Sequence, residues 1–375
     1  MKILLVTTTD KLAEKLAVLN PELEYCAIVV DEVEPAKEIL PNVGLSQDLI
    51  YPMEELKNCV ENLQYDYVLC LQDRFYNEQI LKLKMPSLPK EKIVSFATLP
   101  TTKNFMTKRR LKYYQAHSQE IEMFATGTST TEAAIDIRNF KYKAINFAES
   151  SQDLYYNFLI AKDIISYGGE HNKLRYALIG LAPYSFHFDL SKTFMFKCRV
   201  LLYFIAFNDL HNFPVPLDIY KKFFRENWSN RKLSIAKVNI NGVKSHRVIA
   251  KQDIVKVHPK TWAKKSYPET RDENIKILDD YLTLCEENNV RPIMFRVIVS
   301  EKYMKNFNPN LLEEFNCIVE QACEKHPSAC FVDGWKLQGF TYDDFYDHGH
   351  MNIHGAAKFS AYLSGFIEGL ETKEH

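Results

Sequence analysis

Two segments far apart in the sequence carry the residue types of nucleophilic catalysis. The first, Gly127-Thr128-Ser129-Thr130-Thr131-Glu132, follows a short apolar run at residues 123–125. A serine at a strand-to-helix turn lies beside the free N–H groups of a helix N-terminus, which can stabilise an oxyanion. Ser129-x-x-Glu132 is also the pattern of a capping box, in which serine only satisfies those N–H groups. Taken alone, the serine motif favours capping over catalysis.

The second segment, Asp347-His348-Gly349-His350-Met351-Asn352, lies between the last predicted strand and the last predicted helix. Asp347 precedes His350 by three residues, so a carboxylate on a tight turn can accept the Nδ1 proton while Nε2 faces outward. The imidazole is then in the tautomer that takes a proton from a serine. Asn352 is predicted to be the N-cap of the last helix. The two segments together predict a catalytic triad of Ser129, His350 and Asp347.

The second segment also contains residues that could ligate a metal ion. His348, His350 and His354 are metal-ligand types, and the last two have the i, i+4 spacing of a helical metal pair. Asn352 and Gly355 predict a turn that breaks this helical register. We therefore favour the triad, expect no metal or cofactor, and keep a metallohydrolase as an alternative.

Residues 1–100 predict the first domain that must accompany these motifs. Short apolar runs alternate with amphipathic segments, which is typical of a parallel sheet covered by helices on both faces. Strands are predicted at residues 2–7, 25–30, 67–71 and 92–96, and helices at 11–19, 54–63 and 77–83. The pattern predicts a small doubly wound, Rossmann/flavodoxin-like domain.

The carboxyl edge of that first sheet is where a ligand would bind. It carries Thr7-Thr8-Thr9-Asp10 and Gln72-Asp73-Arg74, and no G-x-G-x-x-G follows the first strand. Without those glycines a dinucleotide is not expected. We interpret the domain as one for assembly, including oligomerisation, or for positioning a partner, with a nucleotide or nucleotide-sugar site as the alternative.

A second doubly wound domain is predicted at residues 121–375, after a helical connector at 101–120. Its strands are expected at residues 123–125, 144–147, 176–181, 293–299 and 330–333, and its helices at 153–167, 273–287, 311–325 and 355–370. The predicted fold class is therefore α/β with two parallel sheets. An insertion at about 189–270 is rich in aromatic residues and predicts a lid, an acceptor-binding wall or simple packing.

Composition narrows the classes of partner. The 47 basic and 48 acidic residues give a net charge of -1 and are well mixed, so no nucleic-acid partner is expected. The basic run Lys108-Arg109-Arg110 is interpreted as a solvated helix face. The N-terminal run does not resemble a signal peptide, and residues 194–207 are too short and too charged to span a membrane. A cytoplasmic location is the expectation.

The motif order gives a more specific resemblance. Gly127-x-Ser129 after the first strand of the second domain, followed by Asp347-x-x-His350 before the last helix, resembles the SGNH (GDSL-like) hydrolase superfamily. Asn146-Phe147-Ala148-x-Ser150-Ser151 and the wider string ending at Gly355 resemble bacterial members related to surface-polysaccharide O-acylation. The resemblance covers about residues 120–372 and implies a three-layer αβα sandwich.

The resemblance also implies roles for individual residues. Ser129 is the implied nucleophile and first oxyanion N–H donor, His350 the general base and acid, and Asp347 the orienting carboxylate. The family's second oxyanion donor is a glycine N–H after the second strand, where this sequence has Ser150-Ser151. The family's G-x-N-D block is replaced by Gly180-Leu181-Ala182-Pro183, so we expect either that Tyr184, Ser185 or His187 substitutes for its asparagine or that the site is slow. The oxyanion and substrate contacts are thus expected from Gly127, Thr128, Ser150, Ser151, Tyr184 and Ser185.

These residues predict a serine-dependent esterase or O-acyltransferase that acts through an acyl-enzyme. The resemblance implies an acylated sugar or polysaccharide, or a small acyl ester, as substrate. The alternative from another class is a non-catalytic protein that binds a glycan or a partner with a degenerate hydrolase fold. The missing asparagine and the capping interpretation of Ser129 both favour that alternative.

Overall fold

The computed structural model describes residues 1–10, 12–17, 19, 22–71, 85–95, 106–168, 173–193, 199–213, 217–220, 235–254 and 266–374. The chain forms two compact units, the first of Met1–Phe105 and Ser191–Leu233, the second of Met106–Leu190 and Ser234–His375. The insertion predicted at 189–270 is therefore divided between the units. Within the part of the chain that the structure describes, no helix is long and apolar enough to cross a membrane.

The first unit is built on a five-stranded parallel sheet of order β3-β2-β1-β4-β5. Its strands are β1 (Lys2–Thr7), β2 (Glu24–Val30), β3 (Ile50–Pro52), β4 (Tyr67–Leu71) and β5 (Ile93–Ser95). Its helices are α1 (Leu12–Ala17), α2 (Val33–Ile39), α3 (Leu56–Asn62) and α8 (Val200–Phe207). The sequence missed β3, because three residues that include a proline give too short an apolar run. The helix predicted at 77–83 and the edge residues Gln72-Asp73-Arg74 lie outside the described residues.

Strand β1 explains why the first sheet has apolar strands without alternation. Ile3 and Leu5 pack in one hydrophobic core, whereas Leu4 and Val6 pack in another. Successive side chains of a strand point to opposite faces, so both faces of this sheet are covered. Burial on both sides requires a continuous apolar run, which is the pattern that the sequence contains.

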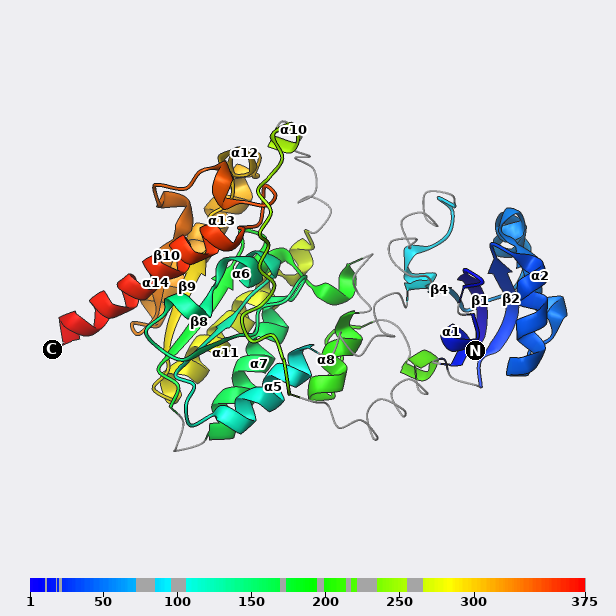
Figure 1. Ribbon diagram of the computed structural model, residues 1–375, viewed down its shortest axis with the longest axis horizontal. Coiled ribbons are helices and arrows are strands. Elements are labelled where there is room, and N and C mark those ends of the chain that lie inside the picture. Colours follow the sequence, from blue (N-terminus) through cyan, green and yellow to red (C-terminus); the bar gives the residue numbers. More distant parts are fainter. Residues whose placement is uncertain are drawn as a thin grey trace. The chain divides into compact units, whose positions relative to one another are not determined.

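The second unit contains another five-stranded parallel sheet, of order β10-β9-β8-β6-β7. Its strands are β6 (Met123–Thr126), β7 (Ala144–Asn146), β8 (Tyr176–Leu181), β9 (Arg291–Arg296) and β10 (Cys330–Asp333). Its helices are α5 (Met106–His117), α6 (Ser129–Ala134), α7 (Leu154–Gly168), α10 (Lys251–Ile254), α11 (Arg271–Glu287), α12 (Glu301–Lys305), α13 (Pro309–Lys325) and α14 (Ile353–Glu374). The predicted α/β class with two parallel sheets is confirmed (Figure 1).

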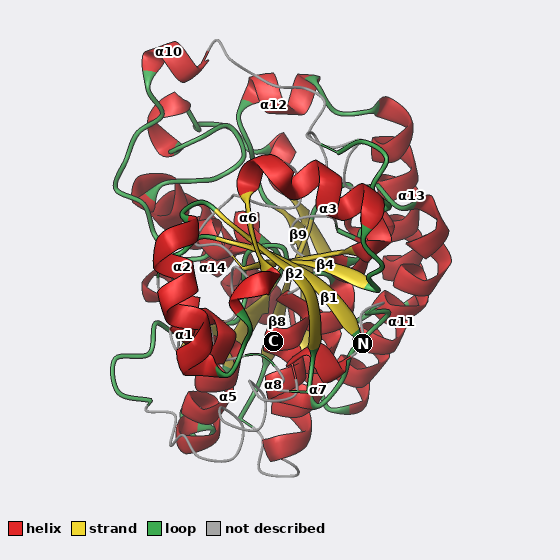
Figure 2. Cartoon of the chain, turned by 90° about the vertical axis from the view of Figure 1, so that its right-hand side faces the viewer, coloured by secondary structure: helices red, strands yellow, loops and turns green. Residues whose placement is uncertain are grey.

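Helices lie on both faces of this second sheet; Figure 2 colours helices red and strands yellow. On one face Met123 and Ala125 of β6 pack in a core with Phe359 of α14. On the other face Thr126 lies 3.0 Å from the Tyr281 hydroxyl of α11. The alternation along β6 thus places α14 and α11 on opposite sides of the sheet.

The strand order fixes where a ligand would meet the second sheet. The chain passes from β6 to β7 on one side and then returns to β8 on the other side of β6. Such a reversal opens a crevice at the carboxyl end of the first strand, which is where doubly wound folds bind ligands. The segment that follows β6 begins with Gly127, Thr128 and Ser129.

Candidate active site

Ser129 is the first residue of α6 and does not cap the helix. Thr128 occupies the N-cap position with an extended backbone and makes no side-chain cap hydrogen bond. The Ser129 Oγ instead lies 2.8 Å from Nε2 of His350, a residue 221 positions away in the sequence. The capping interpretation of Ser129 is therefore wrong, because its hydroxyl is directed at an imidazole rather than at the helix N–H groups.

Asp347 holds the other side of the His350 ring. Its carboxylate oxygens lie 2.9 and 3.0 Å from Nδ1 of His350. A carboxylate only accepts hydrogen bonds, so Nδ1 carries the proton and Nε2 of the neutral ring accepts from the Ser129 hydroxyl. The structure thus brings the three predicted triad residues into one hydrogen-bonded chain.

The Asp347 carboxylate is also fixed by the backbone of its own turn. Its Oδ1 accepts hydrogen bonds from the N–H groups of Gly349 and His350, at 2.8 and 2.9 Å. Burial alone would raise the pKa of Asp347, but the hydrogen bond and charge interaction with His350 and these two N–H donors lower it below the usual 3.8. Asp347 is therefore ionised near neutral pH and able to stabilise an imidazolium.

The loop that carries Asp347 and His350 is closed at both ends. Phe345 and Met351 form an antiparallel bridge, and the Tyr346 ring stacks on the His350 imidazole with centroids 5.4 Å apart. Asn352 is buried, and its Oδ1 accepts from the N–H groups of His354 and Gly355. The prediction that Asn352 caps the last helix is confirmed. This cap fixes the start of α14 directly behind the imidazole.

The turn before Ser129 requires glycine. Gly127 has a φ of 151°, and a Cβ at this position would lie 2.3 Å from Thr131 Oγ1. On the neighbouring strand β8, a Cβ at Gly180 would lie 1.9 Å from the same oxygen. Both glycines therefore make room for Thr131, which sets α6 close against the ends of β6 and β8.

The turn after β7 contains the predicted second oxyanion donor. Ser151 has a φ of 61°, the left-handed region that glycine adopts most readily. The Glu149 N–H donates to Gly127 O at 3.2 Å, and the Ala148 N–H donates to Oδ1 of buried Asn146 at 3.0 Å. The Ser150 and Ser151 turn is thus tied directly to the turn that precedes Ser129.

The segment after β8 leaves one candidate in place of the family's asparagine. The Ser185 Oγ accepts from the Ala182 N–H at 2.9 Å, so this hydroxyl stabilises its own turn. His187 faces Ser266 and Glu314, with its Nε2 2.8 Å from the Glu314 carboxylate. Tyr184 is buried and hydrogen-bonds the Thr128 side chain, and burial raises its pKa. Of the three substitutes considered, Tyr184 is the one for which the structure describes a hydrogen bond to the turn Gly127–Ser129.

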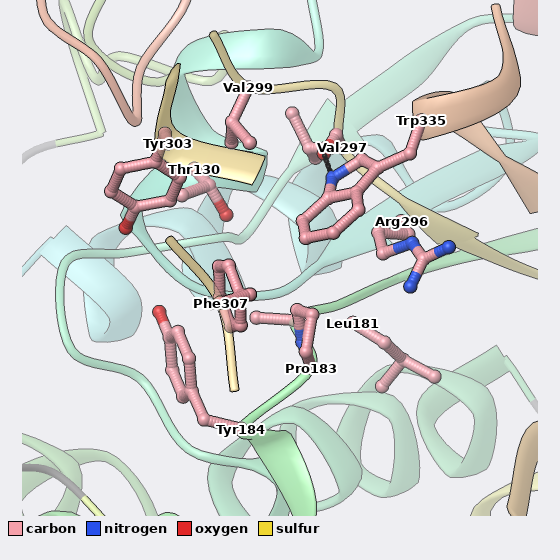
Figure 3. Close-up of a pocket in the computed structure, with 11 residues that line it drawn as sticks. Thr130, Leu181, Pro183, Tyr184, Arg296, Val297, Val299, Tyr303, Phe307 and Trp335 are labelled. Carbon is pink, nitrogen blue, oxygen red and sulfur yellow. Dashed lines mark hydrogen bonds between the residues drawn. The ribbon is translucent and has the colours of Figure 1, made fainter. Parts of the chain in front are cut away.

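A small cavity adjoins the site (Figure 3). Its volume is about 20 Å³, and aromatic side chains of Tyr184, Tyr303, Phe307 and Trp335 contribute much of its lining. Thr130, the residue after Ser129, also lines the cavity, so the cavity begins beside the turn Gly127–Ser129. A space of this size holds one group of about the size of a water molecule.

The histidines of the metal alternative have other partners. His348 Nδ1 lies 2.8 Å from the Ser300 hydroxyl, and its Nε2 lies 3.0 Å from Asp253 O. His350 uses both ring nitrogens for Ser129 and Asp347, and His354 is exposed at the start of α14. Among the described residues, these three imidazoles do not gather ligand atoms within 4.8 Å of one another. The arrangement therefore favours the triad over a metal site.

One irregular segment beside the site, residues 238–249, lies within the insertion predicted at about 189–270, and we name it the strap. The strap meets β7 where the Asn146 N–H donates to Ile240 O at 2.8 Å. It meets the histidine loop where the Ile249 N–H donates to Phe345 O, also at 2.8 Å. The strap thus links the serine side of the site to the histidine side. It has no apolar periodicity, so no sequence signal marks it.

The interpretation of Arg110 as part of a solvated helix face is wrong. Its side chain is 1% exposed, and its Nη1 donates to Ala148 O at 3.1 Å. Its Nε donates to Asn239 O of the strap at 2.8 Å. The guanidinium therefore lies between two segments that border the site.

Comparisons with known proteins give little further information. No protein-family model and no curated protein sequence matches this chain. Among solved structures, an acetyl xylan esterase (Est2A) from the rumen bacterium Butyrivibrio proteoclasticus matches with a TM-score of 0.31 and 9% identity. The match covers 67% of this chain and 64% of that one, so this chain spans less than two thirds of that protein's length.

Proposed function

We propose that this protein is a serine esterase of the SGNH type that cleaves acyl esters through an acyl-enzyme on Ser129. The observation that supports the proposal most is the continuous hydrogen-bonded chain from the Ser129 Oγ through His350 to the Asp347 carboxylate. This chain lies after β6, where the reversal of strand order opens a crevice. The position of these three residues in the sheet and the hydrogen bonds between them therefore support the same function.

The geometry supports a two-step reaction. His350 Nε2 takes the Ser129 proton as Oγ bonds to the ester carbonyl carbon, and the carbonyl oxygen becomes an oxyanion. The backbone N–H groups of Ser129 and of the Ser150 and Ser151 turn are the proposed donors to that oxyanion. When the carbon–oxygen bond to the alcohol breaks, His350 returns the proton to the leaving alcohol.

The second step decides between an esterase and an O-acyltransferase. Water attacks the acyl-Ser129 carbonyl, His350 takes its proton, and the carboxylic acid leaves as Ser129 regains the proton. A sugar hydroxyl in place of water gives acyl transfer by the same proton movements. The cavity of about 20 Å³ beside Thr130 favours a short acyl group. The resemblance to polysaccharide-modifying proteins favours a carbohydrate ester.

The test compares wild type with Ser129→Ala in two assays, release of nitrophenolate from p-nitrophenyl acetate and release of acetate from an acetylated oligosaccharide. Ser328→Ala, which removes a hydroxyl bonded to Glu286, is the matched control. We expect Ser129→Ala to lose at least about a thousandfold in kcat, because no nucleophile remains. Equal rates in wild type and Ser129→Ala would overturn the proposal.

A non-catalytic glycan-binding protein is the second candidate. The observation that favours it is Ala182-Pro183 at the positions of the family's asparagine and aspartate. Losing one oxyanion donor costs about a hundred- to a thousandfold in rate. Oligosaccharide binding by isothermal titration, without acetate release from the same oligosaccharide, would favour this candidate.

A further inference from the structure

Arg110 is a charged residue buried next to the site, at a position where the fold alone does not require a charge. Arg110 lies on α5 with 1% of its side chain exposed. Moving a guanidinium out of water is costly unless hydrogen bonds and opposite charges compensate for the lost hydration. The groups that surround Arg110 therefore indicate what the charge does.

The partners of Arg110 belong to three separate segments that border the site. Its Nε donates to Asn239 O of the strap, and its Nη1 donates to Ala148 O in the turn after β7. Its Nη2 lies 3.8 Å from a carboxylate oxygen of Glu132 on α6, and its Nη1 lies 3.9 Å from Glu149. The planar guanidinium thus contacts α6, which begins at Ser129, the turn after β7 and the strap.

Arg110 carries part of the positive charge in this cluster. Burial raises the pKa of Glu132, the nearby Glu149 raises it further, and Arg110, the Val243 N–H and Lys244 act in the opposite direction. The other cation, Lys244, bonds the backbone oxygen of Glu132, and burial lowers its pKa to about 8. Removing Arg110 would leave two carboxylates facing each other between α6 and the turn.

The turn that Arg110 contacts leads directly to the oxyanion donors. Ala148 and Glu149 precede Ser150 and Ser151, and the Glu149 N–H also bonds Gly127 O in front of the nucleophile. A shift of the turn by a fraction of an ångström would move Ser151 relative to Ser129. Rates of enzymes fall steeply when reacting groups are displaced in this way.

We propose that Arg110 is a positioning residue that fixes the Ser150 and Ser151 turn at the distance from Ser129 that oxyanion stabilisation requires. This inference rests on the proposed function, since the oxyanion site belongs to that reaction. None of the hydrogen bonds and ion pairs that the structure describes for Arg110 involves a triad residue. Arg110 acts through Ala148 O, Asn239 O and the two carboxylates. A lysine cannot reproduce these contacts, because its single nitrogen lacks the planar fork in which Nε and Nη1 each reach a different carbonyl oxygen.

The test uses Arg110→Met, which keeps an unbranched apolar stem but removes the charge, and Arg110→Lys, which keeps the charge but not the planar guanidinium fork. Arg109→Met is the control, since Arg109 lies on the same helix and donates to Ala236 O. Two measurements are made on the full chain, kcat and KM for p-nitrophenyl acetate and hydrogen exchange of the peptide at residues 147–152. In the folded protein the N–H groups of Ala148, Glu149 and Gln152 are hydrogen-bonded, so exchange reports the turn directly.

We expect kcat to fall about 10- to 100-fold in both Arg110 variants, with KM changed less than about threefold, because the chemical step loses a placed donor. Exchange at 147–152 should speed up in both, while Arg109→Met behaves as wild type. Folded variants with wild-type kcat and exchange would overturn the proposal, and so would loss of folding in both. If wild type has no esterase activity, the proposed function fails, and exchange of the turn alone decides the role of Arg110.

Discussion

Replacing Asp347 by Asn should reverse the tautomer of His350 while leaving the loop in place. Asp347 Oδ1 accepts from the backbone N–H groups of Gly349 and His350, so the amide oxygen of an asparagine takes that position. Its NH2 group then occupies the Oδ2 position, 3.0 Å from His350 Nδ1. The amide oxygen, 2.9 Å from Nδ1, already accepts from two backbone N–H groups, and the NH2 group cannot bond a second donor. We therefore expect Nδ1 to give up its proton and Nε2 to carry it toward Ser129. An imidazole in this tautomer cannot take the serine proton.

The expected loss follows from that tautomer. A serine triad with the wrong imidazole tautomer loses about 10⁴ in kcat, equal to about 5.5 kcal/mol of activation free energy. Hydrolysis of p-nitrophenyl acetate measures the loss, and the thermal midpoint should change little because both backbone hydrogen bonds to residue 347 remain. Asp343→Asn, an exposed carboxylate in the same loop, is the control. A folded Asp347→Asn protein with kcat within about tenfold of wild type would refute the tautomer argument.

Two predictions concern stability. Gly127→Ala should destabilise by about 1–3 kcal/mol from backbone strain alone, plus a clash with Thr131. Adding Thr131→Ala should recover only the part of the clash that involves Oγ1 and Cγ2, because the Cβ of residue 131 remains 2.6 Å away. Urea unfolding measures both. Burial lowers the pKa of His326, but hydrogen bonds with Glu286 and Asp279 raise it above the usual 6.5. The positive charge of His326, which stabilises the folded protein, is therefore complete below about pH 6.5. It is lost as pH rises through the raised pKa of His326, so Tm should fall over that range. His326→Gln should remove this fall in Tm. If Tm of the variant depends on pH as it does in wild type, the assignment of the fall to His326 is contradicted.

The sheets could be predicted from sequence because their strands are buried on both faces. Such strands give continuous apolar runs, and β1, β6 and β8 appear at nearly the predicted residues. Strand β3 gave no such run, since it has three residues and none is fully buried. The course of the strap could not be predicted, because irregular backbone has no periodic pattern.

The candidate site was predictable to different degrees. The contact of Asp347 with His350 is local, so a spacing of three residues implies it. The contact of Ser129 with His350 spans 221 positions and follows only from both segments lying at the same edge of one sheet. Arg110 was misinterpreted because a basic run does not indicate which of its members faces the interior. Its partners come from α6, the β7 turn and the strap, which only the tertiary structure brings together.

The most direct test of the central claim is to map where a fluorophosphonate probe binds covalently. Such a probe reacts with a serine only when a neighbouring base has activated its hydroxyl. Peptide mass spectrometry of the labelled wild type should find a single adduct on Ser129, and Ser129→Ala should remain unlabelled. A folded wild-type protein that takes up no probe, or that carries it on another residue, would contradict the account.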